Sequence, residues 1–430
     1  MKHQLVTKKL SSGSELLIIN IPNAQTVYFG VFLRSGNRYA PKDKFELPHL
    51  LEHLAFEGNK HYPDPIEYRF ELEKHGAYNN AYTNMWFNWF ETIGNMEELN
   101  DAIKLTLYQV FEPIHTQRSI DYESQTIINE LSRKLNTDRK KINYKILQTM
   151  YGNKFLGIKK RIESVERIKR QDLVEYFERF YGTKNSFIVL AGSFSDQEMN
   201  GMAQKIDSLL HNYNRGVLRE INPVKLSGNK KVFTMTSSSP NQTAFQVRFS
   251  QAGLNKDDLP VLQVLQTIYS HGQSSRMHIK ARQAGLTYGL SSWYGSDIDG
   301  TEFVVEDQTS DEKLMPLFEM AVTELQDIVS GNFSDKEFER AVGYQIGQIK
   351  RSYQTPINYA DWYWRDFILG IKLTSPESFI SQIKKVSRED IVGVGQKYIK
   401  NDNWILGLSG RNVSSKKEAL TNLLEKTFIY

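Results

Sequence analysis

His49, Glu52 and His53 are the residues whose types and spacing in this sequence could perform chemistry. Each residue of an α-helix turns about 100° around the axis, so the two histidines differ by about 40° and the glutamate lies about 60° to the other side of His49. Two imidazoles and a carboxylate on one helix face can hold a zinc ion and place a base beside it. Because zinc lowers the pKa of a bound water, this pattern predicts metal-assisted hydrolysis.

The neighbouring residues favour a short helix around this motif. They supply a proline tolerated in a first turn, an apolar stripe and a glycine stop: Pro48, Leu50, Leu51, Leu54 and Gly58. The alternative is that three polar residues meet by chance on a solvated helix face. A catalytic zinc site also needs a third ligand, so the motif alone does not complete a site.

The stretch from Leu47 to Gly58, LPHLLEHLAFEG, resembles the inverted zinc motif H-x-x-E-H of the pitrilysin-type (M16) metallopeptidases. This family includes insulin-degrading enzyme and the mitochondrial processing peptidase. The resemblance implies a third zinc ligand about seventy-seven residues beyond the second histidine, at Glu130. It also implies that Glu123, seven residues earlier on the same helix face, supports the site without binding the metal. Without the resemblance, both glutamates would be interpreted as solvated helix residues.

The resemblance further implies a zinc-dependent endopeptidase that hydrolyses peptides or unfolded polypeptide segments. His49, His53 and Glu130 would hold one Zn²⁺ per chain, and Glu52 would act as the general base toward the attacking water.

A second segment that resembles the family lies in the sequence between the histidine motif and the two glutamates. Gly76-Ala-Tyr-Asn-Asn80-Ala81-Tyr-Thr83 resembles the G-x-x-x-N-A-x-T segment that opens an edge strand beside the family's active site. Asn80 and Ala81 would then offer main-chain hydrogen bonds to a substrate peptide. Taken alone, the segment predicts only a turn followed by an amphipathic strand.

Internal repetition indicates a duplicated architecture. The segment from Ile168 to Val174 corresponds to the segment from Val386 to Val392 at an offset of 218. Upstream, ELPHLLEH at 46–53 corresponds to DLPVLQVL at 258–265 at an offset of 212. In the second copy Val261, Val264 and Leu265 replace the three motif residues, so this copy keeps the helix and loses the metal.

The repeats predict an α+β fold of two homologous domains. The expected boundaries are a zinc-binding catalytic domain at 1–213, a linker at 214–230 and a homologous domain at 231–430 that lacks the zinc site and contacts substrate. Long helical stretches are expected at 113–147 and 311–353. The family resemblance implies that each domain is a mainly antiparallel sheet backed by helices, and that the two enclose a substrate cleft.

The second half departs from the family at one place. Active members often carry an arginine and, seven residues later, a tyrosine that both reach the substrate near the zinc. Tyr288 matches that tyrosine, but Arg282 precedes it by six residues. Because one residue rotates a helical side chain by about 100°, this shift could carry the arginine away from the cleft.

This departure leaves several partners and functions open. A heterodimer with a paralogous chain would supply the missing group, as in small family members that work as pairs, and a homodimer is the simpler alternative. The chain could also be the catalytic subunit of a processing peptidase that needs a partner, or a non-catalytic assembly protein of the same fold.

Composition indicates a globular enzyme. With 430 residues, 40% apolar and 12% aromatic, the chain can bury large cores. No apolar run reaches the length of a membrane span, and MKHQLVTKKL lacks a signal peptide's hydrophobic region, so we expect a cytoplasmic protein without membrane contact. A formal charge of +4 gives no reason to expect a nucleic-acid partner. The absence of cysteine excludes disulfides, thiolate zinc ligands and cysteine catalysis.

Overall fold

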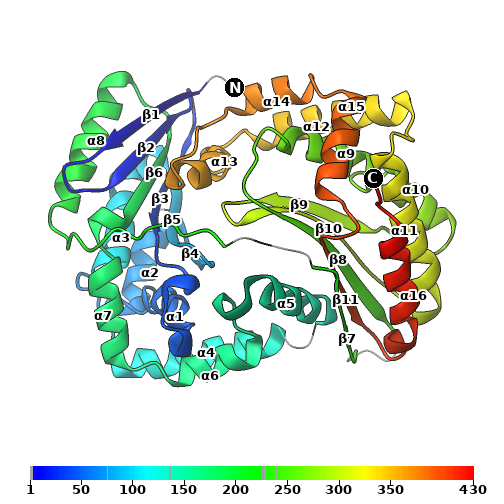
Figure 1. Cartoon of the computed structure of the whole chain (residues 1–430). Coiled ribbons are helices and arrows are strands. Elements are labelled where there is room, and N and C mark those ends of the chain that lie inside the picture. Colours follow the sequence, from blue (N-terminus) through cyan, green and yellow to red (C-terminus); the bar gives the residue numbers. More distant parts are fainter. Residues whose placement is uncertain (1–2, 75, 135–136, 225, 227–228, 238–240) are drawn as a thin grey trace. The chain divides into compact units, whose positions relative to one another are not determined.

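The computed structural model of the chain describes residues 3–74, 76–134, 137–224, 226, 229–237 and 241–430. Its strands form two sheets, and helices back each sheet (Figure 1). This arrangement confirms the α+β fold class predicted from the sequence.

The first sheet has six strands in the order β1-β2-β6-β3-β5-β4. Only β2 and β6 pair in parallel, and the other neighbours are antiparallel. The strand bounds are Gln4–Lys9 (β1), Glu15–Asn20 (β2), Thr26–Leu33 (β3), Tyr78–Thr83 (β4), Asn88–Asn95 (β5) and Ser186–Gly192 (β6). The sequence SFIVLAG of β6 is buried throughout, as a continuous apolar run in a central strand should be. The polar sequence YNNAYT forms β4 at the sheet edge.

Helices cover both faces of this sheet. On one face α3 packs on β3 and β5, where the hydroxyls of Thr92 and Thr106 lie 2.6 Å apart. On the other face α13 packs on β2, β3 and β6, where the rings of Phe32 and Trp364 stack at 5.0 Å. The helices grouped with this sheet are Leu47–Leu54 (α1), Pro65–Lys74 (α2), Leu99–Phe111 (α3), Gln117–Lys134 (α4), Ile158–Glu166 (α6), Arg170–Phe180 (α7), Asp196–Leu210 (α8) and Pro356–Ile368 (α13).

The second sheet has five strands in the order β7-β11-β8-β10-β9. Its strands are Lys231–Met235 (β7), Thr243–Ala252 (β8), Ser291–Ser296 (β9), Gly300–Thr309 (β10) and Trp404–Ser409 (β11). Its helices are Asp138–Tyr151 (α5), Leu259–Tyr269 (α9), Arg276–Gln283 (α10), Leu314–Val329 (α11), Asp335–Ser352 (α12), Pro376–Ile383 (α14), Arg388–Tyr398 (α15) and Val413–Lys426 (α16). Among the residues that the structure describes, the strand order repeats that of the first sheet without a counterpart of β1.

The repeat seen in the sequence matches the element bounds. The first residues of α7 and α15 are 218 positions apart, and so are their last residues. The helix that replaces α1 in the second copy is α9, where Val261, Val264 and Leu265 are buried. The metal-site positions of the first copy are therefore apolar packing positions in the second.

The chain divides into two compact units that are not contiguous in sequence. The first unit comprises Met1–Ser132, Ile158–Ile221 and Ser352–Thr374, and the second comprises the remaining segments. Each unit thus contains one helix from the other half of the sequence, because α5 belongs to the second unit and α13 to the first. Their first residues, Asp138 and Pro356, are again 218 positions apart, so these two helices are equivalent in the repeat.

This exchange differs from the contiguous domains expected at 1–213 and 231–430. A helical pattern shows which face of α5 is apolar but not which sheet that face will cover. Ile142, Ile146 and Met150 of α5 pack in one core cluster with Ala244 and Ile405 of the second sheet. The expected linker at 214–230 contains no helix or strand in its described residues, and 225, 227 and 228 lie outside them.

The two long helical stretches expected from the sequence are each divided. The stretch at 113–147 contains α4, which ends at Lys134, and α5, which begins at Asp138. The stretch at 311–353 contains α11 and α12, separated by Gly331 with a φ of +87°. A positive φ ends a helix readily at glycine, so this break has a local cause.

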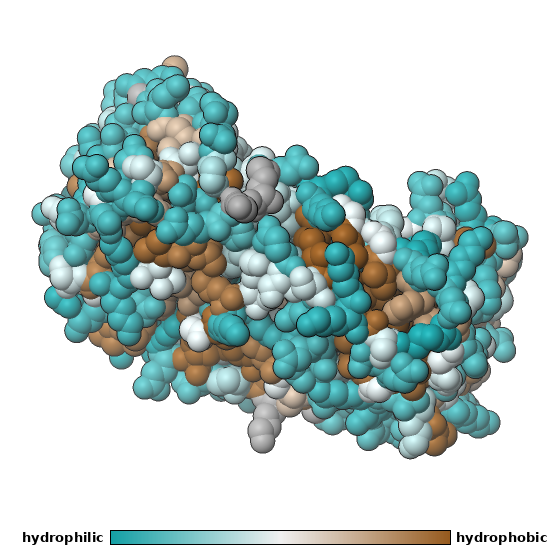
Figure 2. Space-filling view, turned by 90° about the horizontal axis from the view of Figure 1, so that it is seen from above, coloured by the Kyte–Doolittle hydropathy of each residue, from teal (hydrophilic) through white to brown (hydrophobic). Residues whose placement is uncertain are grey.

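In the described parts of the chain, no helix combines the length and the apolar character needed to cross a membrane. Figure 2 shows one face of the molecule, where hydrophilic residues predominate and apolar residues gather in separate patches. Such patches are usual on folded proteins, because polar residues do not suffice to cover the whole surface.

Candidate metal centre

Helix α1 positions the three motif residues. It spans Leu47–Leu54 with Pro48 in its first turn, and Leu50, Leu51 and Leu54 are buried, which confirms the predicted helix and its apolar stripe. Gly58 follows with a φ of +104°, and a Cβ there would lie 2.5 Å from the carbonyl oxygen of Pro63. Only glycine fits this turn. Helix α1 has already ended at Leu54, however, four residues before the stop that the sequence predicted.

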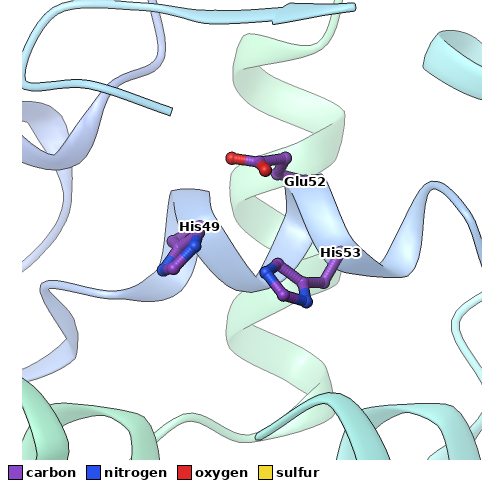
Figure 3. A group of neighbouring side chains, drawn as sticks. All are labelled: His49, Glu52 and His53. Atoms are coloured by element: carbon purple, nitrogen blue, oxygen red, sulfur yellow. The ribbon is translucent and has the colours of Figure 1, made fainter. Parts of the chain in front are cut away.

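The side chains of His49, Glu52 and His53 project from this short helix (Figure 3). One ligand atom from each of the three lies within 4.8 Å of the others. The two imidazole rings lie at right angles with their centroids 4.9 Å apart, and their side chains are 13% and 16% exposed. The pair is therefore close and partly open to solvent.

Helix α4 brings the two glutamates to the same place. The buried apolar residues of this helix are Ile120, Ile127 and Leu131. Glu123 is buried with them, whereas the side chain of Glu130 is 41% exposed. The two carboxylate oxygens of Glu130 lie 3.8 Å from Nε2 of His49 and 3.9 Å from Nε2 of His53. The structure thus gathers all five site residues of the first half that the sequence assigned to the metal and its support.

A carboxylate holds the other nitrogen of each imidazole. Nδ1 of His53 lies 2.7 Å from Oε2 of Glu123, and Nδ1 of His49 lies 2.9 Å from Oε2 of Glu46. An ionised carboxylate can only accept, so each Nδ1 must carry the proton and donate it. The lone pair of each imidazole is then at Nε2, on the side of Glu130.

This donor set fits a zinc ion. Two Nε2 lone pairs and a carboxylate are all acceptors, and they lie too far apart for direct hydrogen bonds. Ligands about 2.0–2.2 Å from a tetrahedral zinc are themselves separated by roughly 3.4 Å, close to the observed 3.8 and 3.9 Å. The two Nε2 atoms and the carboxylate repel one another, and they are already spaced nearly as zinc ligands are. A bound cation would therefore stabilise this arrangement.

The surrounding charges act on the imidazole of His53. Burial lowers its pKa, but the hydrogen bond that Nδ1 donates to Glu123 and the charges of the surrounding glutamates outweigh burial and raise the pKa. In the metal-free protein the site is thus strongly attractive to positive charge, whether a proton or a metal ion.

Glu52 carries a buried acceptor beside the two histidines. Its Oε2 atom is buried and has no hydrogen-bond partner among the described residues. A buried carboxylate oxygen without a donor is costly, so this atom is suited to receive a proton from a water or a substrate group. The charge of Glu52 also adds to burial in raising the pKa of the Tyr181 hydroxyl.

The sequence reasoning missed Glu46 as a site residue. It precedes His49 by three residues, is fully buried and bonds its imidazole. A signal was present in principle, since a metal-binding histidine almost always donates its second ring nitrogen to an acceptor. Each of the two histidines therefore needed an acceptor for its second ring nitrogen, and the sequence reasoning named only Glu123.

The expected substrate strand is β4, at the sheet edge and packed against α1. Asn80 donates through Nδ2 to the hydroxyls of Tyr78 and Tyr82 at 3.0 and 2.8 Å. Its Oδ1 accepts from the amide of Ala81 at 2.9 Å. In this state the side chain of Asn80 therefore occupies the amide that was expected to pair with substrate.

Arg282 and Tyr288 lie together in the second unit. The guanidinium carbon of Arg282, at the end of α10, is 5.1 Å from the centroid of the Tyr288 ring. The ring is 77% exposed, and His278 contacts it edge-on with centroids 6.2 Å apart. The interval of six residues thus still brings the arginine against the tyrosine.

Comparison with known proteins identifies the family. Residues 15–159 match the family described as Insulinase (Peptidase family M16), and residues 167–343 match the Peptidase M16 inactive domain. The chain belongs to peptidase family M16. The first match contains every residue described above for the candidate metal centre, and the second contains Arg282 and Tyr288. The family predicted from the motif is therefore confirmed.

Relatives in family M16 cover nearly the whole chain. An uncharacterized zinc protease of Rickettsia bellii is 23% identical over 405 residues, covering 91% of this chain and 94% of its own. The mitochondrial-processing peptidase subunit beta of Saccharomyces cerevisiae is 23% identical over 412 residues, covering 90% and 87%. The crystal structure of a protease from Helicobacter pylori has a TM-score of 0.83 at 15% identity, covering 95% and 99%, and supports the fold alone.

Proposed function

We propose that this chain is a zinc-dependent endopeptidase that cleaves peptides or unfolded polypeptide segments. The single observation that carries the proposal is the set of facing acceptors, in which Nε2 of His49 and of His53 lie opposite the carboxylate of Glu130. Membership in family M16 and relatives named as zinc proteases support the same reading.

In the proposed reaction the ligands of one Zn²⁺ are Nε2 of His49, Nε2 of His53 and the carboxylate of Glu130. Zinc bound there supplies Lewis-acid polarisation of the scissile carbonyl and lowers the pKa of water. Glu46 and Glu123 orient the imidazoles by accepting from Nδ1.

Glu52 is the proposed general base. Its unpartnered Oε2 takes the proton of the attacking water, holds it during attack and returns it to the leaving amine. Without this transfer, the amine would leave as a strongly basic anion.

Four further residues belong to substrate binding in this proposal. The edge strand β4 would pair with an extended peptide through Ala81 once Asn80 turns away from the amide. Tyr288 would hydrogen-bond the substrate or its tetrahedral oxyanion, with Arg282 stacked on its ring.

A heterodimeric processing peptidase is a second candidate, favoured by the relative named as a subunit of mitochondrial-processing peptidase. In that case the chain supplies the metal centre and a paralogous chain binds the substrate. The simpler alternative to this heterodimer is a homodimer of the chain itself. We place either form in the cytoplasm as part of the proposal.

The test measures zinc content and hydrolysis of an unfolded polypeptide by the purified chain. We expect about one zinc per chain, and activity that a chelator removes and zinc restores. His49→Ala should lose zinc and activity together. A wild-type protein that takes up no zinc during refolding with the metal would contradict the proposal.

A further inference from the structure

The two imidazoles of the metal centre have different supports. His53 bonds Glu123, which lies on α4 and whose side chain is 10% exposed. His49 bonds Glu46, which directly precedes α1 and has no exposed side-chain surface. The second support is a deeply buried carboxylate, and it requires its own explanation.

Contacts at both ends fix the position of Glu46. Its backbone amide donates to Oγ of Ser164 at 3.3 Å, and its carbonyl accepts from the amide of Leu50 at 2.9 Å. Its side chain is shared, since Oε2 accepts from His49 and Oε1 accepts from Nε of Arg161. The carboxylate is therefore bound to the protein through both oxygens.

Arg161 supplies the charge that this buried carboxylate needs. It lies on α6, its side chain is 11% exposed, and the ring of Phe45 lies 5.4 Å from its guanidinium carbon. The guanidinium of Arg161 is permanently charged and donates to Oε1 of Glu46, so it stabilises the ionised form of this carboxylate. An ionised carboxylate can act only as an acceptor.

Stability alone does not account for this ion pair. Removing two charges from water is expensive, and well-packed apolar residues in place of a buried ion pair are often neutral or stabilising. The pair does, however, leave Glu46 only one role toward His49, which is to accept its Nδ1 proton. It thereby fixes the tautomer and the direction of the imidazole.

We propose that Glu46 is a positioning residue for the metal, and that Arg161 keeps it in place, forming a line Arg161–Glu46–His49 that holds Nε2 toward the ion. This inference rests on the proposed function, because it assigns a role toward a metal bound by His49. Glu46 touches neither substrate nor reacting atoms and acts only through the imidazole.

The experiment compares zinc affinity among matched variants of the full chain. Glu46→Gln keeps the shape and removes the charge, but it also takes the carboxylate of Glu46 away from the buried charge of Arg161. The double variant Glu46→Gln/Arg161→Gln removes both charges and avoids that defect. Glu163→Gln is the control, because this glutamate is on the same helix as Arg161, is 56% exposed and pairs with the exposed Arg167.

Three measurements separate positioning from structure. Zinc affinity is determined by competition with a chromophoric chelator, the visible spectrum of the cobalt-loaded protein reports ligand geometry, and unfolding of the zinc-free protein reports folding. We expect zinc affinity to fall about 10–100-fold in both Glu46 variants, with an altered cobalt spectrum, and to be unchanged in Glu163→Gln.

Unchanged zinc affinity and cobalt spectrum in the double variant would overturn the inference, even if the zinc-free variant unfolds at a lower temperature. That result would make the ion pair purely structural. A different result would contradict the proposed function itself. In that case neither the wild-type protein nor His49→Ala would bind zinc. Loss of affinity in the folded double variant supports the positioning role.

Discussion

At the scale of single residues, Glu52 is the group on which the proposed chemistry depends most. Its Oε2 is buried and has no partner in the part of the chain that the structure describes, and it lies next to a site that gathers acceptors for a cation. The carboxylate is therefore available for a proton in a way that Glu46 and Glu123, both bonded to histidines, are not.

Glu52→Gln should retain zinc and lose at least about a hundredfold in kcat, because the amide keeps the size of the side chain but cannot accept the proton. Zinc content and steady-state hydrolysis of a peptide measure the two properties separately. Glu163→Gln serves as the matched control. Retained turnover in Glu52→Gln would show that another group is the base.

Arg282 and Tyr288 provide the second prediction at this scale. The guanidinium stacks on the tyrosine ring, so we expect the two residues to act as one unit. Tyr288→Phe should lower kcat and kcat/KM together by up to about tenfold, since one neutral hydrogen bond contributes about 0.5–1.5 kcal/mol. Arg282→Ala should cause a similar loss, and the double variant should be little worse than either.

The controls and contrary outcomes for this pair are direct. Arg167→Ala removes an exposed arginine that directly follows α6 and has no proposed role, so both constants should stay unchanged. Additive losses would mean that the two residues act separately. Harmless changes at both positions would make a partner chain with its own arginine and tyrosine the better explanation.

At the scale of elements, the exchanged helix α5 shows what the sequence does and does not specify. Its apolar residues recur at helical spacing, so a helix could be predicted, but its sheet could not. The facing strand β11 has a glycine at the point of contact, and a Cβ on Gly407 would lie 2.4 Å from Cγ2 of Ile142. The close approach of helix and strand therefore depends on this glycine.

Gly407→Ala should destabilise the protein by about 1–3 kcal/mol, because an added methyl overpacks the contact with α5. Gly393→Ala is the matched control, since Gly393 lies within α15 and an added Cβ would meet nothing within 4 Å. There alanine should stabilise by about 0.5–1 kcal/mol through helix propensity. Urea unfolding measures both, and equal effects of the two substitutions would contradict the close-contact argument.

The elements that were predicted well share a physical feature. Strand β6 has a continuous apolar run, and α1 has an apolar stripe with a proline in its first turn. Both elements formed as expected from these local patterns. Glu46 was not found because its role depends on Arg161, which lies 115 residues away and meets it only through folding. Local periodicity carries no information about such pairs.

At the scale of the whole molecule, all the proposed metal ligands lie in the first compact unit. His49 and His53 are on α1, and Glu130 is on the part of α4 that belongs to the same unit. Zinc binding should therefore stabilise that unit directly, while the second unit would gain stability only if the two units unfold together.

Removing zinc should lower the thermal stability of the chain. A ligand at about a thousand times its Kd stabilises the folded state by about 4 kcal/mol, since it binds only the folded site. Calorimetry with zinc and with a chelator measures this shift, and His49→Ala, which lacks a ligand, should show none. If the two units unfold separately, zinc should move one transition and leave the other in place. A zinc-dependent shift that persists in His49→Ala would show that the metal binds elsewhere in the chain.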